Sequence, residues 1–146
     1  MRALFAIVLL AGCRPGLATE GLPSAEGYET WYRVDRTGAV SGHGDTYREI
    51  FVNDVGRSYP HGGRYAIGTV VVKEIRAVAD GGGPGSLRYS AVARKVGEDA
   101  DVEADVDGGW IWSRRNDDGD EVLGYRCWQG CHTQAPVDGM FYDYGE

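Results

Sequence analysis

The sequence lacks several features that would place it in common functional classes. It has 15 basic against 22 acidic residues, a formal net charge of −7 and no basic patch. We therefore expect no nucleic-acid partner, because nucleic-acid backbones are bound by concentrated positive charge. The apolar run near the N-terminus, 3–10, is far shorter than the about 20 residues that cross a bilayer. The chain also has only three cysteines, so the position of each one is informative.

What remains is the composition of a small globular protein. A length of 146 residues favours one domain, and a hydrophobic content of 42% is enough to form a core. The 23 glycines predict a chain rich in loops. A long acidic stretch, 96–107, lacks the regular ligand spacing of an EF-hand, so we interpret it as a solvated loop rather than a calcium site.

The N-terminus has the pattern of a secretory signal. A positively charged start, Met1-Arg2, precedes the apolar run, and Leu-Ala-Gly then leads into Cys13. This order resembles a bacterial lipobox, in which Cys13 would carry lipid; an ordinary signal peptide with a chance cysteine is the alternative. We expect an exported bacterial lipoprotein that is tethered to a membrane in the periplasm or cell envelope. The expected parts are a signal peptide over 1–12, a flexible tether over 13–27 and a folded domain over 28–146.

The other two cysteines lie near the C-terminus, in the order Cys127-Trp-Gln-Gly-Cys131-His132. Two cysteines followed at once by a histidine are typical of c-type haem attachment. The thiols form thioethers with the porphyrin, and the histidine is the proximal iron ligand. The usual spacer has two residues and this one has three; Gly130 could absorb the extra residue by adopting a positive φ.

Two other interpretations of the motif stay open. A disulfide between Cys127 and Cys131 would leave the adjacent histidine without a role. A zinc site would need a second Cys/His pair, and the other histidines, His43 and His61, stand alone and far apart. We take one covalently attached haem c as the expected cofactor. Export agrees with this expectation, because bacteria attach haem covalently outside the cytoplasm.

The pattern between these two motifs predicts several strands and one short helix. A helix over 25–32, capped by Ser24, should present aromatic side chains to the core. We expect loops over 54–67 and 79–86, a charged turn over 114–121, and an ordered part that ends near residue 141. Strands are expected over 46–53, 68–75, 87–95 and 108–113.

The segment 68–75 has the strongest strand pattern, with three consecutive valines. Because side chains alternate along a strand, Lys73 shares a face with Thr69 and Val71, and Glu74 lies on the opposite face. A charged side chain should therefore lie among apolar neighbours whichever face is buried. The simplest interpretation is a lysine that extends to solvent at a strand end.

Several stretches together resemble the cytochrome P-460 family, which includes the beta-type cytochromes c-prime. The resemblance covers about 47–141. The stretches that carry it are Tyr47-Arg-Glu-Ile-Phe-Val-Asn53, Gly68-Thr-Val-Val-Val-Lys-Glu74, Gly108-Gly-Trp110, the late Cys-Cys-His, and Asp138 with Phe141.

The resemblance implies an α+β fold that is mainly β: a compact antiparallel sheet with a few short helices around one haem c. It also implies that the haem iron is five-coordinate and open to small nitrogen-oxide ligands. Met140 is only eight residues beyond His132, which makes it a poor candidate for the opposite haem face. The remaining candidates for a sixth ligand are His43 and His61, which we expect at the surface.

Within that family, some members oxidise hydroxylamine with a haem that is further bonded to a lysine, and Lys73 is the matching lysine here. Those members also carry a distal carboxylate on the following strand. Registering the strands by Lys95 puts Ala91 at that place, and the segment 89–93 contains no acid. This departure argues against hydroxylamine oxidation.

Three functions follow from the resemblance. The favoured one is a haem protein that captures or senses nitric oxide or a related small nitrogen ligand. The second is an oxidoreductase acting on hydroxylamine or nitric oxide, with Lys73 as the haem crosslink. The third is a periplasmic electron carrier that serves a redox partner protein and has His43 or His61 as the sixth ligand.

Overall fold

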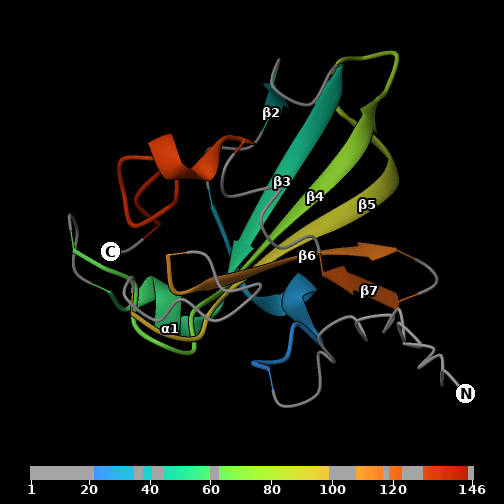
Figure 1. Cartoon of the computed structure of the whole chain (residues 1–146). Coiled ribbons are helices and arrows are strands. Elements are labelled where there is room, and N and C mark those ends of the chain that lie inside the picture. Colours follow the sequence, from blue (N-terminus) through green and yellow to red (C-terminus); the bar gives the residue numbers. More distant parts are fainter. Residues whose placement is uncertain are drawn as a thin grey trace, which may run out of the picture.

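The computed structural model describes residues 22–34, 38–40, 45–59, 63–98, 108–116, 119–122 and 130–144. These residues form one antiparallel sheet with one short α-helix and two 3-10 turns. Figure 1 shows the sheet, with β3, β4 and β5 side by side. The strands are β1 Tyr32–Arg33, β2 Gly38–Val40, β3 Thr46–Val52, β4 Val70–Val78, β5 Pro84–Lys95, β6 Trp110–Asn116 and β7 Gly119–Val122; the helical elements are η1 Tyr28–Thr30, α1 Asp54–Arg57 and η2 His132–Gln134.

The order of the strands follows the chain closely. The five strands β3 to β7 are neighbours in sequence order, and the short strands β1 and β2 both pair with β3. The mainly β, antiparallel fold predicted from the sequence is therefore confirmed. All four expected strands are present, although β4 runs three residues further than expected and β5 begins at Pro84, inside the expected loop.

Three local predictions were wrong. The helix expected over 25–32 is only the single turn η1, because Gly27 takes a left-handed φ of 69° before it and Ser24 Oγ bonds the nearby amide of Glu26 instead. The loop expected from residue 54 begins with α1, which Asn53 caps by accepting the amide of Gly56 at 3.1 Å. The charged turn expected over 114–121 is mostly strand.

The hairpin of β6 and β7 explains the last of these corrections. Arg114 stands opposite Glu121 in the register, and Arg115 stands opposite Asp120. Opposite charges at facing positions favour pairing of two strands. The charged residues that suggested a turn, basic first and acidic after them, are therefore compatible with a hairpin.

The sheet is buried on both faces, which explains why the centre of β4 is a continuous apolar run. The Lys73 face carries the larger core, and the C-terminal segment packs over it; we define this face by Ile50, Val71, Lys73, Ala91, Ala93, Trp112 and Arg114. The Glu74 face carries Phe51, Val70, Val72, Glu74 and Val92, which the N-terminal residues Ala25 and Tyr28 cover. The two covering segments are the red and blue parts of Figure 1.

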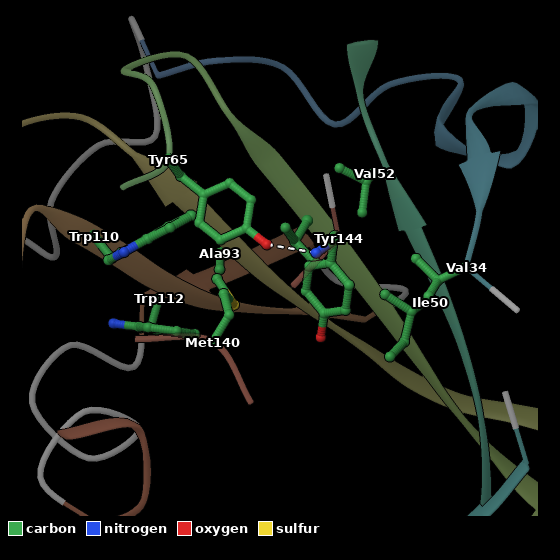
Figure 2. Packing of buried hydrophobic residues seen from close by; sticks show 10 residues of the cluster. Val34, Ile50, Val52, Tyr65, Ala93, Trp110, Trp112, Met140 and Tyr144 are labelled. Atoms are coloured by element: carbon green, nitrogen blue, oxygen red, sulfur yellow. Dashed lines mark hydrogen bonds between the residues drawn. The ribbon is translucent and has the colours of Figure 1, made fainter. Parts of the chain in front are cut away.

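The ordered part extends beyond the end expected from the sequence. Tyr144 is 7% exposed, and its amide donates to the hydroxyl of Tyr65 at 2.8 Å (Figure 2). Tyr65, Tyr144 and Met140 lie together with Trp110 and Trp112 in the core of the Lys73 face. The tail of the chain therefore closes this core.

The described end of the expected tether packs against the sheet. Ala25 is 2% exposed, and Arg94 on β5 donates from Nε to the carbonyl of Pro23 at 2.9 Å. The folded part therefore includes residues before 28. No helix in the described ranges has the length and apolarity that crossing a membrane requires.

Candidate functional site

His132 lies at the start of η2, on the side of the sheet that carries the Lys73 face. Its Nδ1 is 2.6 Å from the carbonyl oxygen of Gly139, and its ring centroid is 4.0 Å from that of Trp112. A carbonyl oxygen only accepts, so Nδ1 carries the proton, and in the neutral ring the lone pair is then on Nε2. An imidazole whose Nδ1–H is bound to a backbone carbonyl is the usual form of a metal-ligating histidine. The surroundings of His132 therefore suit an iron ligand at Nε2.

Cys131 precedes this histidine and is exposed, with no disulfide partner among the residues that the structure describes. Its carbonyl accepts the amide of Gln134 at 3.1 Å, which holds it at the start of η2. Gly130 lies in helical backbone and, unlike six other described glycines, does not have a positive φ. Gly130 therefore does not use the positive φ that would be open to it for absorbing the extra residue of the spacer.

Lys73 lies in the middle of β4, and the expectation of a lysine at a strand end is wrong. Its partners in the register are Ile50 on β3 and Ala91 on β5, and Ala91 in turn pairs with Arg114 on β6. The side chain is half-buried. Ala91, the residue that the family resemblance places near the missing distal carboxylate, therefore stands beside Lys73 in the sheet.

Three buried hydrogen-bond donors of the Lys73 face have no partner within the described part of the chain: Arg48 Nε, Trp112 Nε1 and Arg114 Nε. Arg48 pairs with Ile75 in the register and therefore shares this face with Lys73. Buried polar groups are almost always hydrogen-bonded, and leaving one without a partner costs about 1–3 kcal/mol. The face therefore offers donors and positive charge to an acceptor that is not part of the described protein.

Aromatic rings hold both of these arginines in place. The guanidinium carbon of Arg48 lies 5.0 Å from the ring centre of Tyr142, whose hydroxyl accepts a bond from Arg48 Nη2 at 3.0 Å. The guanidinium carbon of Arg114 lies 4.4 Å from the ring centre of Tyr89. Such stacking restricts the side chains and keeps their charge near the sheet.

Carboxylates are scarce on this face. In the described strands β3 to β6, no residue on the Lys73 face is an aspartate or a glutamate. On β7, Glu121 stands opposite Arg114 in the register, and its side chain lies outside the described part. The described strands of this face are therefore rich in donors and poor in proton acceptors; the carboxylate that packs against the face, Asp138, comes from the covering segment and is paired with Lys95.

The tyrosines of the core do not supply the missing base. Burial raises the pKa of Tyr65 to about 12, and burial also raises the pKa of Tyr144. Both phenols therefore stay protonated near neutral pH, where they donate hydrogen bonds and do not accept protons.

The remaining sites expected from the sequence are placed as follows. Met140 is buried in the core and joined to Val137 by backbone bonds, so it belongs to the same segment as His132. Within the described ranges there is no cluster of three side chains that could hold a metal ion. Four predicted residues lie outside the described residues: Cys13, His43, His61 and Cys127.

Sequence reasoning missed Arg48, Trp112 and Arg114. The signal was the strand alternation itself, since each of them is in register with a residue of the Lys73 face. A cavity of about 290 Å³ also went unpredicted. It lies between residues 25–29 and β5, and is lined by exposed charged side chains such as Glu26 and Arg88.

Comparison of the chain with protein-family models finds no family that matches it. No curated protein matches it either. Its function is therefore inferred from its own residues and their geometry.

Proposed function

We propose that this chain is a mono-haem c-type cytochrome of the kind that the cytochrome P-460 resemblance implies. In this proposal Cys127 and Cys131 hold the haem by thioether bonds, and His132 ligates the iron through Nε2. The observation that carries the proposal is the 2.6 Å contact between His132 Nδ1 and the Gly139 carbonyl, directly beside an exposed cysteine. When bound, haem c supplies an iron centre that changes its charge by one electron and takes small ligands.

We place the haem beside the Lys73 face, on the side where Trp112 contacts His132. The apolar residues of this face, such as Ile50, Ile75 and Ala93, are already buried by the protein itself, so they do not form an open porphyrin surface. The donors of Arg48 and Arg114 that lack a partner among the described residues suit the two carboxylates that a haem carries.

The ligand that we propose is nitric oxide or a related small nitrogen compound. Met140 is held on the His132 side by its bonds to Val137, which supports an iron with one open position. The absence of acids from the described strands β3 to β6 of the Lys73 face favours ligand binding over a reaction that removes protons.

Hydroxylamine oxidation with a crosslink to Lys73 is the second candidate. It is favoured by the position of Lys73 at the centre of the face that also carries Trp112, which contacts His132. This candidate function lacks a base at position 91. In the row of paired residues that runs from Lys73 through Ala91 and Arg114, the carboxylate is that of Glu121 on β7. An electron carrier with His43 or His61 as the sixth ligand stays a prediction, as both histidines lie outside the described residues.

The cellular location that we propose rests on the sequence alone. We propose that Cys13 is lipidated and that the domain works outside the cytoplasm, tethered to a membrane and exchanging electrons with a redox partner protein. The tether is needed because removal of 1–12, with Arg2, leaves 14 basic against 22 acidic residues. A protein with a net charge of −8 is repelled by anionic lipid.

Attachment of haem is tested by intact mass and by acid-acetone extraction. We expect the mature wild-type chain to be heavier by one haem that survives extraction. In the Cys127→Ser and Cys131→Ser variants the haem should be held less firmly. Cys13→Ser is the matched control, since it removes a thiol without changing the haem content. A wild-type chain lighter only by two hydrogens would contradict the proposal and favour the disulfide.

The ligand is tested by the ferrous spectrum with and without nitric oxide. We expect a high-spin spectrum that changes when nitric oxide is added. A red-shifted spectrum would indicate the Lys73 crosslink, and a sharp low-spin spectrum would indicate a sixth protein ligand. His132→Ala should retain attached haem and lose the proximal bond.

A further inference from the structure

The carbonyl that binds His132 belongs to a tight turn. Val137 and Met140 exchange both backbone hydrogen bonds, at 3.1 and 2.7 Å, around Asp138 and Gly139. Their φ angles are 45° and 82°, so both central residues are left-handed, as in the type I′ turns that favour Asp-Gly. Asp138 is the single described residue other than glycine with a positive φ.

The side chain of Asp138 is clamped by two donors. Lys95 Nζ is 3.0 Å from Oδ1, and the amide of Tyr65 is 2.8 Å from Oδ2. The indole N–H of Trp110 also donates to the backbone carbonyl of Asp138 at 2.8 Å. The turn is therefore attached by three bonds, all of them to Asp138: two from the strand residues Lys95 and Trp110 and one from Tyr65, in the segment before β4.

Lys95 is itself fixed. It is 0% exposed at the end of β5, its ammonium also donates to the carbonyl of Gly108 at 3.0 Å, and it lies 5.3 Å from the ring centre of Trp110. A buried charge of this kind is retained only where it is paired and hydrogen-bonded. Removal of either partner would leave the other charge buried without this counter-charge.

The clamp lies one peptide unit from the His132 contact. Asp138 is fixed by its carboxylate and its carbonyl, and the next carbonyl, that of Gly139, accepts His132 Nδ1–H. Because the turn is closed by the Val137–Met140 bonds, its orientation follows that of Asp138. The direction of the Gly139 carbonyl therefore depends on the ion pair.

We propose that Lys95 and Asp138 are positioning residues for His132. Their ion pair holds the turn so that the Gly139 carbonyl selects the Nδ1–H form of the imidazole and orients its ring, with Nε2 as the ligating atom. The role as an iron-ligand support rests on the proposed function, whereas the selection of the imidazole form does not. Groups that orient a metal-ligating histidine typically change metal affinity by about 10- to 100-fold when they are replaced.

The first test reads the protonation form of His132 by ¹⁵N NMR in the full chain without haem, with His132→Ala to assign the signal. We expect Nδ1–H in the wild type. In Asp138→Ala and Lys95→Met the ratio of Nδ1–H to Nε2–H should fall by about fivefold, the factor that a typical hydrogen bond corresponds to. In Asp138→Asn, which keeps the shape of the side chain and one acceptor, the ratio should fall less. This variant provides a reading if the alanine variant does not fold.

The control is Val92→Ala, which opens the core on the Glu74 face and leaves the turn alone. It should destabilise the chain without changing the ratio. The proposal is overturned if Asp138→Ala keeps the wild-type ratio, or if Val92→Ala changes the ratio as much as Asp138→Ala does.

The second test uses the haem-loaded protein. The iron–histidine stretching band of the ferrous form should shift to lower frequency in Asp138→Ala and stay in place in Val92→Ala, because a weaker Nδ1–H bond makes a weaker ligand. An unshifted band in Asp138→Ala overturns the positioning role. A wild-type chain that takes up no haem overturns the proposed function, and the NMR ratio still tests the clamp.

Discussion

Replacing Arg114 by methionine tests whether the Lys73 face receives a carboxylate-bearing group. Its Nε is a buried donor with no partner among the described residues, and removing such a donor should stabilise the chain by about 1–3 kcal/mol. The substitution also removes the stacking over Tyr89, with its 4.4 Å distance, which contributes about 0.5–2 kcal/mol. Without haem the two effects nearly cancel, so the free energy of unfolding should stay within about 1 kcal/mol of wild type.

With haem attached, the same substitution should be destabilising. A hydrogen bond between Arg114 and a haem carboxylate would be lost, and bonds to charged groups contribute about 1.5–3 kcal/mol. The change in the free energy of unfolding on substitution should therefore differ between the two forms by about 2 kcal/mol. The haem remains covalently attached in the unfolded chain, so this difference reports contacts made in the folded state.

Urea denaturation of both forms, with linear extrapolation, measures this difference. Arg88→Met is the matched control, because Arg88 is exposed on β5 and should change stability by less than about 0.5 kcal/mol in either form. Equal effects of Arg114→Met with and without haem would refute the reasoning that the unpaired donors of this face serve the cofactor.

Four further outcomes are expected. Tyr28→Phe should lower the free energy of unfolding by about 1.5–3 kcal/mol in urea, because it removes the 2.8 Å bond from the Tyr28 hydroxyl to the buried carboxylate of Glu74. Stability should fall as the pH rises from 10 to about 12, because burial raises the pKa of Tyr65 to about 12 and the unfolded chain loses that proton first; Tyr65→Phe should flatten the decline in a pH series of melts. Ala91→Glu should increase hydroxylamine oxidation in a steady-state assay with an added electron acceptor, and brisk turnover by wild type would contradict the missing-base explanation. Cys13→Ser should release the protein from the membrane fraction or stop its processing; unchanged fractionation would rule out the lipid anchor.

The sequence was sufficient to predict the central sheet because a strand signal is local. The valines around 70–72 and the alternation around Ala91 and Ala93 are seen within a few residues, and they fix which side chains share a face. Alternation does not fix how neighbouring strands are registered, so the pairing of Lys73 with Ala91 comes from the structure. The short helix at 25–32 was overpredicted for the same local reason, since nothing in the residue pattern revealed the left-handed φ of Gly27.

The contacts that build the candidate site are not local. Lys95 and Asp138 are 43 residues apart, and Tyr28 and Glu74 are 46 apart. Each pair forms because a covering segment folds back onto one face of the sheet, and no periodicity predicts which residue it will meet. The Asp138-Gly139 turn had a local signal, the Asp-Gly pair, but its function depends on those distant partners.

The arrangement of the sheet's outer strands has a consequence for association between copies of the chain. The long strands β4 and β5 are both interior, so their backbone groups are already paired. One edge of the sheet is the four-residue β7, which contains Asp120 and Glu121. The other edge is formed by the two short strands β1 and β2, which pair with different parts of the same side of β3. Short and acidic outer strands oppose edge-to-edge pairing. The described sheet therefore offers a second copy no long strand to extend, which protects the protein from aggregation when many copies are held close together.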